Sequence, residues 1–525
     1  MSTPCYITTG EGQVRTWLSG EGPVVVAVAG LTTSGSVLSA ELSSALPGRC
    51  VVVVEPPGMG GSAALDVTSV EQAAQAVAES LGFVSSDPFA LIAQDLSAAL
   101  VPALLSALPS PPTSTVLLGL ERAEGWVSTQ TTPPDLRPRV DGTHLNALWC
   151  FLRDRALLDP HAPSLPSGSG PALPDTASLN EAFLSAAVEP ERWAVAWSLC
   201  AAGLSAARPA SVHIVELVEQ VPDALGTPIG AGGRVAPPAT QPRPGTAIWN
   251  QYVDTRSGRV HLRRAGSRGR PVLVLSTGGG SSAQFAPVIC GLAESRTVFA
   301  MDYLGNGLSE KVEREVTAGT LAREAVDVLD ALGIDEVDVW GSHTGACVGL
   351  ELGVDFPERV GKLVLEAPVM VTPEFRRELL ERYFPDFAPD HFGLHLQHVW
   401  HWRRDMFMYW PWYRVDRSAA RGIGVPGAQG LHLYAVGILE SGTTYSGAYR
   451  AGFSYDTRAR LPDLKRPAIL TAGPHDMLAN ALEDAASLAP EGMLRILPTP
   501  TTMWWPDPEP QAAAETLALY RDFLG

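Results

Sequence analysis

Positive charge is scarce in this sequence. Lys and Arg together number 38 against 56 Asp and Glu residues, so the formal net charge is −18. Nucleic acids and anionic membrane surfaces are bound through basic faces, which this balance disfavours. We therefore expect neither nucleic acid nor a membrane among the partners of the protein.

Long apolar runs and paired cysteines are also missing. No stretch approaches the roughly 20 apolar residues that span a bilayer, and the first residues, MSTPCYITTGEG, lack the basic and apolar segments of a secretion signal. The six cysteines are scattered without a CxxC pair, so neither a disulfide framework nor a zinc ribbon is indicated. We expect a cytoplasmic protein, and the sequence indicates no cofactor.

Length and composition predict two globular domains. At 525 residues the chain exceeds the size at which a single hydrophobic core stops growing. Residues 226–247 are rich in Pro and Gly and poor in large apolar residues, which is typical of a linker. We place one domain at residues 1–225 and the other at residues 248–525.

The same order of sequence signals recurs in both halves. The segments CVVVVEPPGMGGS and TVFAMDYLGNGLS are short apolar runs ended by Gly or Pro, as buried parallel strands are. Residues 55–62 and 302–309 both follow the pattern acid-x-x-Gly-x-Gly-x-Ser, and residues 134–154 and 385–405 share nine identities at equal spacing. An internal repeat of this kind predicts two tandem α/β domains, each with a mostly parallel sheet. We expect the two copies to pack as an intramolecular pseudo-dimer.

Helical segments interrupt both predicted sheets. Residues 126–206 and 371–460 follow the sixth predicted strand of each half and are predicted to be helical lids. The first half reaches the linker soon after its next strand, whereas the second half continues through two more strands to a closing helix. We therefore interpret the first half as a shortened, degenerate copy that supports the second.

The second half resembles the α/β-hydrolase superfamily over almost all of residues 255–525, and the first half resembles a shortened copy. The resemblance rests on the Gly-rich loop TGGGSS (277–282), the turn that begins at Asp302, the strand-to-helix turn WGSHTGAC, and Gly473-x-x-Asp476. Together these motifs are specific for the fold. They are much less specific for a reaction, because this fold hosts many chemistries.

The strand-to-helix turn carries a histidine where members of the family carry a nucleophilic Ser, Cys or Asp. The family pattern is small-x-nucleophile-x-small, because the backbone of the nucleophile is strained and the strand and helix pack closely around it. Gly341 and Gly345 occupy the small positions when His343 is at the centre. If Ser342 were the nucleophile, Trp340 would stand at a position that requires a small residue.

The resemblance implies a carboxylate partner for His343, but the sequence lacks the separate histidine that the family uses as a base. Asp476 matches the carboxylate that orients a histidine in the family. The base histidine that the family carries after the last strand is missing, because that loop is LPTPTTMWWPDPEP and the last histidine of the chain is His475. In the first half Asp95 matches His343 and is a possible carboxylate nucleophile, but no acid–base pair follows to serve it.

These features favour general-base chemistry. A histidine at this turn lies at a helix N-terminus, whose partial positive charge keeps the imidazole neutral and able to accept a proton. The N–H of Thr344 and one from the loop with Gly278 and Gly279 are expected to form an oxyanion hole. We predict a lyase, isomerase, decarboxylase or cyclase in specialised metabolism, or direct activation of water. Two alternatives remain open: an esterase or thioesterase with a displaced base such as His395, and a ligand-binding pseudoenzyme.

The second lid predicts a pocket for a small hydrophobic substrate. Its segment HFGLHLQHVWHWRRDMFMYWPWY places three histidines on one helical face, but the first half keeps only one of them, and we predict no metal site. The many aromatic residues favour an apolar ligand. We select four residues of this lid for the pocket: Trp400, Arg404, Trp410 and Trp412.

Overall fold

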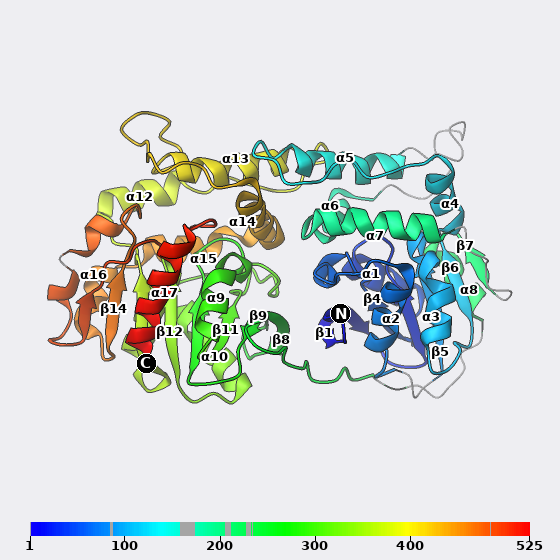
Figure 1. The fold of residues 1–525 in the computed structure, drawn as a ribbon, viewed down its shortest axis with the longest axis horizontal. Helices are drawn as coiled ribbons and strands as arrows, with labels where there is room; N and C mark the ends of the chain where they lie inside the picture. The colour runs from blue at the N-terminus through cyan, green and yellow to red at the C-terminus, as the bar shows by residue number, and fades with distance from the viewer. Residues whose placement is uncertain are drawn as a thin grey trace. The chain divides into compact units, whose positions relative to one another are not determined.

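The computed structural model describes residues 2–84, 88–157, 174–204, 212–226, 233, 235–483 and 485–525. These residues form two compact units. Unit 1 contains Met1–Pro138, Thr143–Gln241 and Pro389–Leu394, and unit 2 contains Arg139–Gly142, Pro242–Ala388 and His395–Gly525. Each unit is built on one mixed, mainly parallel sheet with helices (Figure 1), so the α/β fold class predicted from the sequence is confirmed.

The sheet of unit 1 has seven strands in the order β1-β2-β4-β3-β5-β6-β7. The strands are β1 (Thr3–Thr8), β2 (Gln13–Ser19), β3 (Val24–Val28), β4 (Cys50–Val54), β5 (Phe89–Gln94), β6 (Thr115–Leu118) and β7 (His213–Val215). Strand β2 runs antiparallel to both of its neighbours, and β3 to β7 are parallel to one another. The helices are α1 (Gly35–Ala45), α2 (Val70–Ser80), α3 (Val101–Ala107), α4 (Leu120–Ser128), α5 (Thr143–Leu157), α6 (Thr176–Ala187), α7 (Pro190–Gly203) and α8 (Val221–Leu225).

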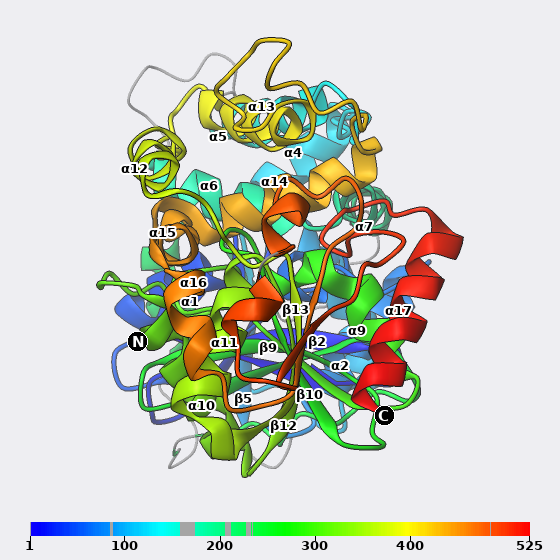
Figure 2. The same ribbon diagram turned by 90° about the vertical axis from the view of Figure 1, so that its left-hand side faces the viewer.

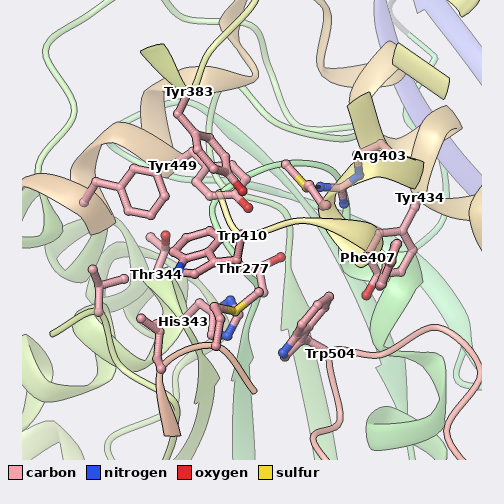
Figure 3. A pocket seen from close by; sticks show the side chains of 15 residues that line it. Thr277, His343, Thr344, Tyr383, Arg403, Phe407, Trp410, Tyr434, Tyr449 and Trp504 are labelled. Carbon is pink, nitrogen blue, oxygen red and sulfur yellow. Dashed lines mark hydrogen bonds between the residues drawn. The ribbon is translucent and has the colours of Figure 1, made fainter. Parts of the chain in front are cut away.

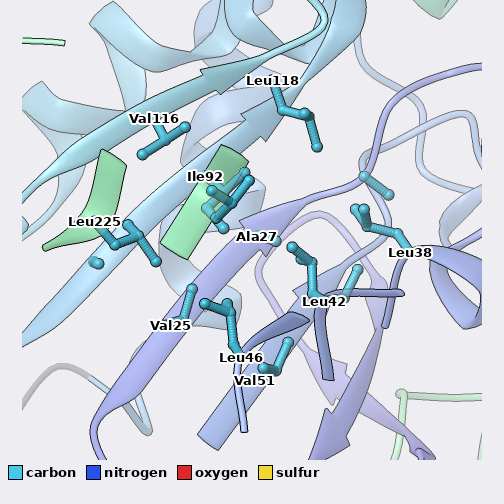
Figure 4. Close-up of a cluster of buried hydrophobic side chains, with 14 residues drawn as sticks. Val25, Ala27, Leu38, Leu42, Leu46, Val51, Ile92, Val116, Leu118 and Leu225 are labelled. Carbon is cyan, nitrogen blue, oxygen red and sulfur yellow. The ribbon is translucent and has the colours of Figure 1, made fainter. Parts of the chain in front are cut away.

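The core of unit 1 lies between its sheet and helices α1 and α8 (Figure 4). Val25 and Ala27 of β3 are fully buried there, because parallel strands covered by helices on both faces need apolar side chains on both faces. Leu38 and Leu42 of α1 are one helical turn apart and pack into the same cluster, which Val221 of α8 closes. Unit 1 therefore has a hydrophobic core of its own.

The sheet of unit 2 has eight strands in the order β15-β14-β13-β12-β10-β11-β9-β8. The strands are β8 (Trp249–Asp254), β9 (Arg259–Ala265), β10 (Pro271–Leu275), β11 (Thr297–Met301), β12 (Val337–Ser342), β13 (Val360–Glu366), β14 (Ala468–Thr471) and β15 (Leu494–Ile496). Among the strands of the described residues, only β15 has no counterpart in the order of the first sheet. The helices are α9 (Ala286–Ala293), α10 (Ala318–Leu332), α11 (Thr344–Asp355), α12 (Pro373–Arg382), α13 (Leu394–Met408), α14 (Ala428–Ser441), α15 (Ser446–Ser454), α16 (Thr457–Arg460) and α17 (Pro510–Leu524).

Helices cover both faces of the unit 2 sheet. Figure 2 shows α9 and α17 on one side of the strands and α10 and α11 on the other. Helices α12 to α16 come between β13 and β14 in the sequence, and α13 and α14 lie beyond one edge of the sheet (Figure 1). Among the described residues, no helix is both long enough and apolar enough to cross a membrane.

The repeated acid-x-x-Gly-x-Gly-x-Ser motif builds the same turn in both units. In unit 2 the Asp302 carboxylate accepts a hydrogen bond from the N–H of Leu308 at 3.0 Å. In unit 1 the Glu55 carboxylate accepts one from the N–H of Gly61 at 2.7 Å. The donor stands six residues after the acid in both motifs, so the acid closes the turn in each unit.

Candidate active site

His343 stands at the strained turn between β12 and α11. Its backbone angles are φ 50° and ψ −107°, a conformation that residues with a side chain rarely adopt. A methyl group added at Gly341 would overlap the carbonyl of Gly345, and one added at Gly345 would overlap the carbonyl of Leu275. The two positions that require small residues therefore flank His343 and not Ser342.

Ser342 belongs to a buried network below the turn. The Ser342 side chain is fully buried, and its Oγ donates a hydrogen bond to Glu366 at 3.0 Å. The other oxygen of Glu366 accepts hydrogen bonds from the N–H of Met503 and the hydroxyl of Tyr520, both at 2.8 Å. Burial raises the pKa of Glu366, although these hydrogen bonds act in the opposite direction. Ser342 is thus bound in the core and does not line the cavity described below.

The imidazole of His343 contacts Asp476, which follows β14. The distance between His343 Nε2 and Asp476 Oδ2 is 3.1 Å, and the side chain of Asp476 is completely buried. The same carboxylate oxygen accepts hydrogen bonds from Trp504 Nε1 at 2.6 Å and from Thr502 Oγ1 at 3.2 Å. The other oxygen accepts the N–H of Leu478 at 2.9 Å. Hydrogen bonds to both oxygens therefore fix the orientation of the Asp476 carboxylate.

The charge state of Asp476 decides which nitrogen of His343 is basic. Burial raises the pKa of Asp476, but the attraction of His343 and the hydrogen bonds from His343, Leu478 and Trp504 lower it more, so the pKa lies below its usual value. An ionised carboxylate only accepts hydrogen bonds, so the proton of the neutral ring is on Nε2. The lone pair of His343 is then on Nδ1, which has no hydrogen-bond partner among the described residues.

The loop after β15 holds no histidine, and other side chains occupy its place. Thr502 and Trp504 of this loop donate to Asp476, and the ring of Trp504 lies 5.3 Å from the ring of His343. In the family pattern a separate histidine would stand between the residue at the turn and the carboxylate. Here the residue at the turn is itself the histidine, so the carboxylate contacts it directly.

Unit 1 contains a second turn of the same kind. The parallel register of its sheet pairs Val28 with Ala93, two residues before Asp95. The register of unit 2 pairs Leu275 with Gly341, also two residues before the turn. Asp95 has a φ of 44° and therefore corresponds to the histidine of unit 2 in both position and conformation.

The carboxylate of Asp95 marks where two backbone N–H groups converge. One oxygen of Asp95 accepts hydrogen bonds from the N–H of Leu31, at 3.1 Å, and from the N–H of Leu96. Leu31 is the third residue after β3, and Leu96 follows the turn, so the residues that correspond to them in unit 2 are Gly278 and Thr344. These two N–H groups form the candidate oxyanion hole of unit 2. In unit 1 the hole is already filled by the protein's own carboxylate.

The Gly-rich loop lies close to helix α15. A methyl group at Gly278 would overlap the backbone of Tyr449, and one at Gly279 would press on the Tyr449 ring. Thr344 begins α11, so its N–H has no acceptor within the helix. The loop glycines thus allow α15 to pack closely against the Gly-rich loop.

The turn, the loop and the lid enclose one cavity in unit 2 (Figure 3). About 560 Å³ of empty space, including the open mouth, lies between the lining atoms. The lining side chains are mostly apolar or aromatic, with a few polar groups: Thr277, His343, Thr344, Val369, Tyr383, Arg403, Met406, Phe407, Trp410, Tyr434, Tyr449, Phe453, Met477, Leu478 and Trp504. This composition suits a small molecule with an apolar body.

Of the lid residues that the sequence suggested, only Trp410 lines this cavity. Trp400 and Trp412 each donate their indole N–H to a backbone carbonyl, at 3.1 and 3.0 Å, and serve the packing of the lid. Arg404 pairs with its neighbour Asp405 at 3.3 Å. His395 is buried on α13 and is absent from the lining. The described residues contain no group of three or more potential metal ligands.

The sequence analysis did not select most of the lining residues, and three of these carry polar groups that matter for the site: Arg403, Tyr434 and Trp504. Arg403 adjoins Arg404, and neighbouring helical residues point about 100° apart, so the choice between them depends on how α13 packs. Trp504 lies in the loop that was searched for a histidine, and the aromatic pair in TTMWW was the available signal. Tyr434 lies on α14, whose sequence contains no motif that marks it.

Comparisons with known proteins identify relatives of this chain. The family described as "alpha/beta hydrolase fold" matches residues 270–406. "Putative carbamate hydrolase RutD" of Caulobacter vibrioides is 30% identical over 215 residues, which cover 40% of this chain and 74% of the relative. "2-hydroxymuconate semialdehyde hydrolase" of Pseudomonas sp. (strain CF600) is 36% identical over 111 residues, which cover 20% of this chain and 39% of the relative.

Solved structures with a similar fold include an enol-lactonase from Burkholderia xenovorans LB400, with 18% identity and a TM-score of 0.40. That match covers 52% of this chain and 99% of the other. Epoxide hydrolase A from Mycobacterium thermoresistibile has 20% identity and a TM-score of 0.42, and the match covers 53% of this chain and 98% of the other.

Proposed function

Because the chain belongs to the α/β-hydrolase fold family, we propose that it is a hydrolase whose unit 2 cleaves an ester-like or carbamate-like bond in a small apolar molecule. The observation that carries this proposal is the hydrogen bond between His343 and Asp476 beside the candidate oxyanion hole. The two relatives described above are named as hydrolases, which supports hydrolysis over lyase, isomerase, decarboxylase or cyclase chemistry.

In the proposed reaction His343 activates water. Nδ1 of His343 removes a proton from a water molecule as the water oxygen attacks the carbonyl carbon. The N–H groups of Gly278 and Thr344 stabilise the negative oxygen that develops. Asp476 stabilises the imidazolium that forms. The tetrahedral intermediate then collapses, the bond to the leaving group breaks, and the imidazolium returns its proton to the leaving atom. Water is consumed, and an acid and an alcohol or amine are released.

A serine acyl-enzyme fits this geometry less well. Ser342 donates to Glu366 in the core, and His395, the displaced base considered from the sequence, is not a lining residue. A nucleophilic serine needs a base within hydrogen-bond reach and an open path to the substrate. These contacts support the histidine and not the serine as the catalytic residue.

Hydrolysis of a panel of 4-nitrophenyl esters, thioesters and carbamates tests the proposal. We expect His343→Gln to lower kcat/KM by about 10²- to 10⁴-fold, the range typical for loss of a general base. Ser342→Ala is the matched control, because it changes the adjacent residue and leaves the cavity intact. Loss of activity in Ser342→Ala with retention in His343→Gln, both in folded protein, would reject the proposal.

A further inference from the structure

Arg403 is a buried cation that faces the cavity and has no acidic partner among the described residues. The side chain lies on α13 and lines the same cavity as His343, and the residue is 3% exposed. In the part of the chain that the structure describes, no carboxylate forms an ion pair with Arg403, and its Nε has no hydrogen-bond partner. Buried charges in proteins are normally paired, so an unpaired buried arginine calls for an explanation.

The contacts that Arg403 does make are weak. Nη2 approaches Gln284 Oε1 at 3.4 Å, and Nη1 approaches the thioether sulfur of Met406 at 3.5 Å. The guanidinium also lies over the rings of Tyr434 and Trp402, 4.6 and 5.4 Å from their centroids. The aromatic contacts stabilise the cation and orient it. They leave most of its five N–H donors without an oxygen acceptor.

A second unpartnered donor lies next to the guanidinium. The hydroxyl of Tyr434 is buried and has no hydrogen-bond partner among the described residues. Figure 3 shows Arg403 and Tyr434 beside each other in the cavity, with His343 well apart from both. A ligand bound by the first two residues would therefore extend toward His343.

Gln284 links this place to the proposed catalytic centre. Its Nε2 donates to Thr277 Oγ1 at 2.8 Å, in the loop that carries the candidate oxyanion hole, while its Oε1 faces Arg403. Gln284 therefore contacts two lining residues of the cavity, Thr277 in the Gly-rich loop and Arg403 on α13.

We infer that Arg403, with the hydroxyl of Tyr434, binds a carboxylate group of the substrate. The planar guanidinium matches the two oxygens of a carboxylate, and the surrounding apolar walls strengthen such a pair. The single positive charge of the guanidinium matches the single negative charge of a carboxylate. The inference rests on the proposed function and narrows the substrates to those with an apolar body, a scissile carbonyl group and a free carboxylate.

Calorimetric binding of phenylacetate and of its neutral isostere phenylacetamide tests this site without requiring turnover. We expect the native protein to bind phenylacetate at least about tenfold more tightly, since charge-assisted hydrogen bonds discriminate by this order. Arg403→Met should abolish the preference. Arg404→Met is the matched control, because Arg404 lies outside the cavity and pairs with Asp405, and it should keep the preference.

Thermal unfolding separates a binding role from a structural one. Removal of an unpaired buried charge should leave the midpoint of Arg403→Met unchanged or raise it, whereas loss of a structural contact would lower it. No preference for phenylacetate in the native protein, or an equal preference in Arg403→Met, would overturn the inference.

Hydrolysis distinguishes this failure from failure of the proposed function. The native enzyme should prefer the 4-nitrophenyl monoester of glutaric acid over 4-nitrophenyl butyrate, and Arg403→Met should reduce this ratio of kcat/KM at least about tenfold. His343→Gln should lose hydrolysis of both esters and still bind phenylacetate. Unchanged ratios with intact His343-dependent hydrolysis would refute the carboxylate site alone.

Discussion

Replacement of Asp476 by Asn removes one charge from the proposed active site and keeps its shape. Asp476 accepts hydrogen bonds from His343, Trp504 and Thr502 at one oxygen and from Leu478 at the other. An amide has a single oxygen, so its NH₂ group must face at least one of these donors. The unsatisfied groups should lower the free energy of unfolding by about 1–3 kcal/mol.

The effect of Asp476→Asn on catalysis should be larger. Without the carboxylate the imidazolium that forms in the reaction loses its stabilising charge, and the tautomer with the proton on Nε2 is no longer enforced. We expect kcat to fall about 10²- to 10⁴-fold, which corresponds to about 3–5 kcal/mol of transition-state stabilisation. The assay measures kcat and KM against pH for the native enzyme and the variant.

The control for Asp476→Asn is Asp507→Asn, because Asp507 also accepts a backbone N–H, at 2.7 Å, but lies outside the cavity. The pKa of Asp476 is depressed in the folded state. Above the unfolded pKa of about 3.9, ionisation of Asp476 therefore contributes to the free energy of unfolding, and this contribution is lost as the pH falls. The Asp476→Asn variant should not show this loss of stability at acid pH. If Asp476→Asn kept kcat within about threefold of native while His343→Gln was inactive, Asp476 would have no role in orienting the histidine.

Three further predictions concern the turns and the core. Gly345→Ala should lower the free energy of unfolding by at least about 2 kcal/mol because its methyl group overlaps the carbonyl of Leu275. Gly319→Ala on α10, whose methyl group would make only ordinary van der Waals contacts, should leave the free energy of unfolding unchanged or raise it, and urea unfolding compares the two variants. Burial raises the pKa of Glu324 to about 7, so the folded state holds more protons than the unfolded state between about pH 4.5 and 7. The native protein should therefore lose stability relative to Glu324→Gln as the pH rises through that range, by at most about 3 kcal/mol, and a difference that is constant from pH 5 to 8 would contradict this. Asp95→Ala should lower stability by about 1–3 kcal/mol and leave kcat unchanged; a loss of kcat in folded protein would mean that unit 1 takes part in catalysis.

The sequence was sufficient to predict that His343 lies between the two small residues of the strand-to-helix turn. The overlap that a methyl group would create at Gly341 or Gly345 involves the turn and the adjoining strand, so the requirement for small residues does not depend on the rest of the fold. The same local logic applies to the acid that closes the turn at Asp302, whose bond to Leu308 spans six residues. Such short-range constraints appear as fixed spacings in one sequence.

The lid side of the site was not predictable in the same way. Arg403 and Arg404 are chemically equivalent in the sequence, and only the packing of α13 decides that one faces the cavity and the other pairs with Asp405. The bond between Trp504 and Asp476 joins a loop to a residue 28 positions earlier. No periodic pattern in the sequence encodes these contacts. The many aromatic residues of the lid therefore indicated a pocket but did not show which of them line it.

Intact-mass analysis after treatment with a fluorophosphonate probe separates general-base catalysis by His343 from catalysis by a nucleophilic serine. We expect the catalytically active, folded protein to acquire no adduct on Ser342 or on any other serine of unit 2, and hydrolysis to continue after treatment. A stoichiometric adduct on Ser342, with loss of hydrolysis, would refute general-base catalysis by His343 and identify the protein as a serine hydrolase.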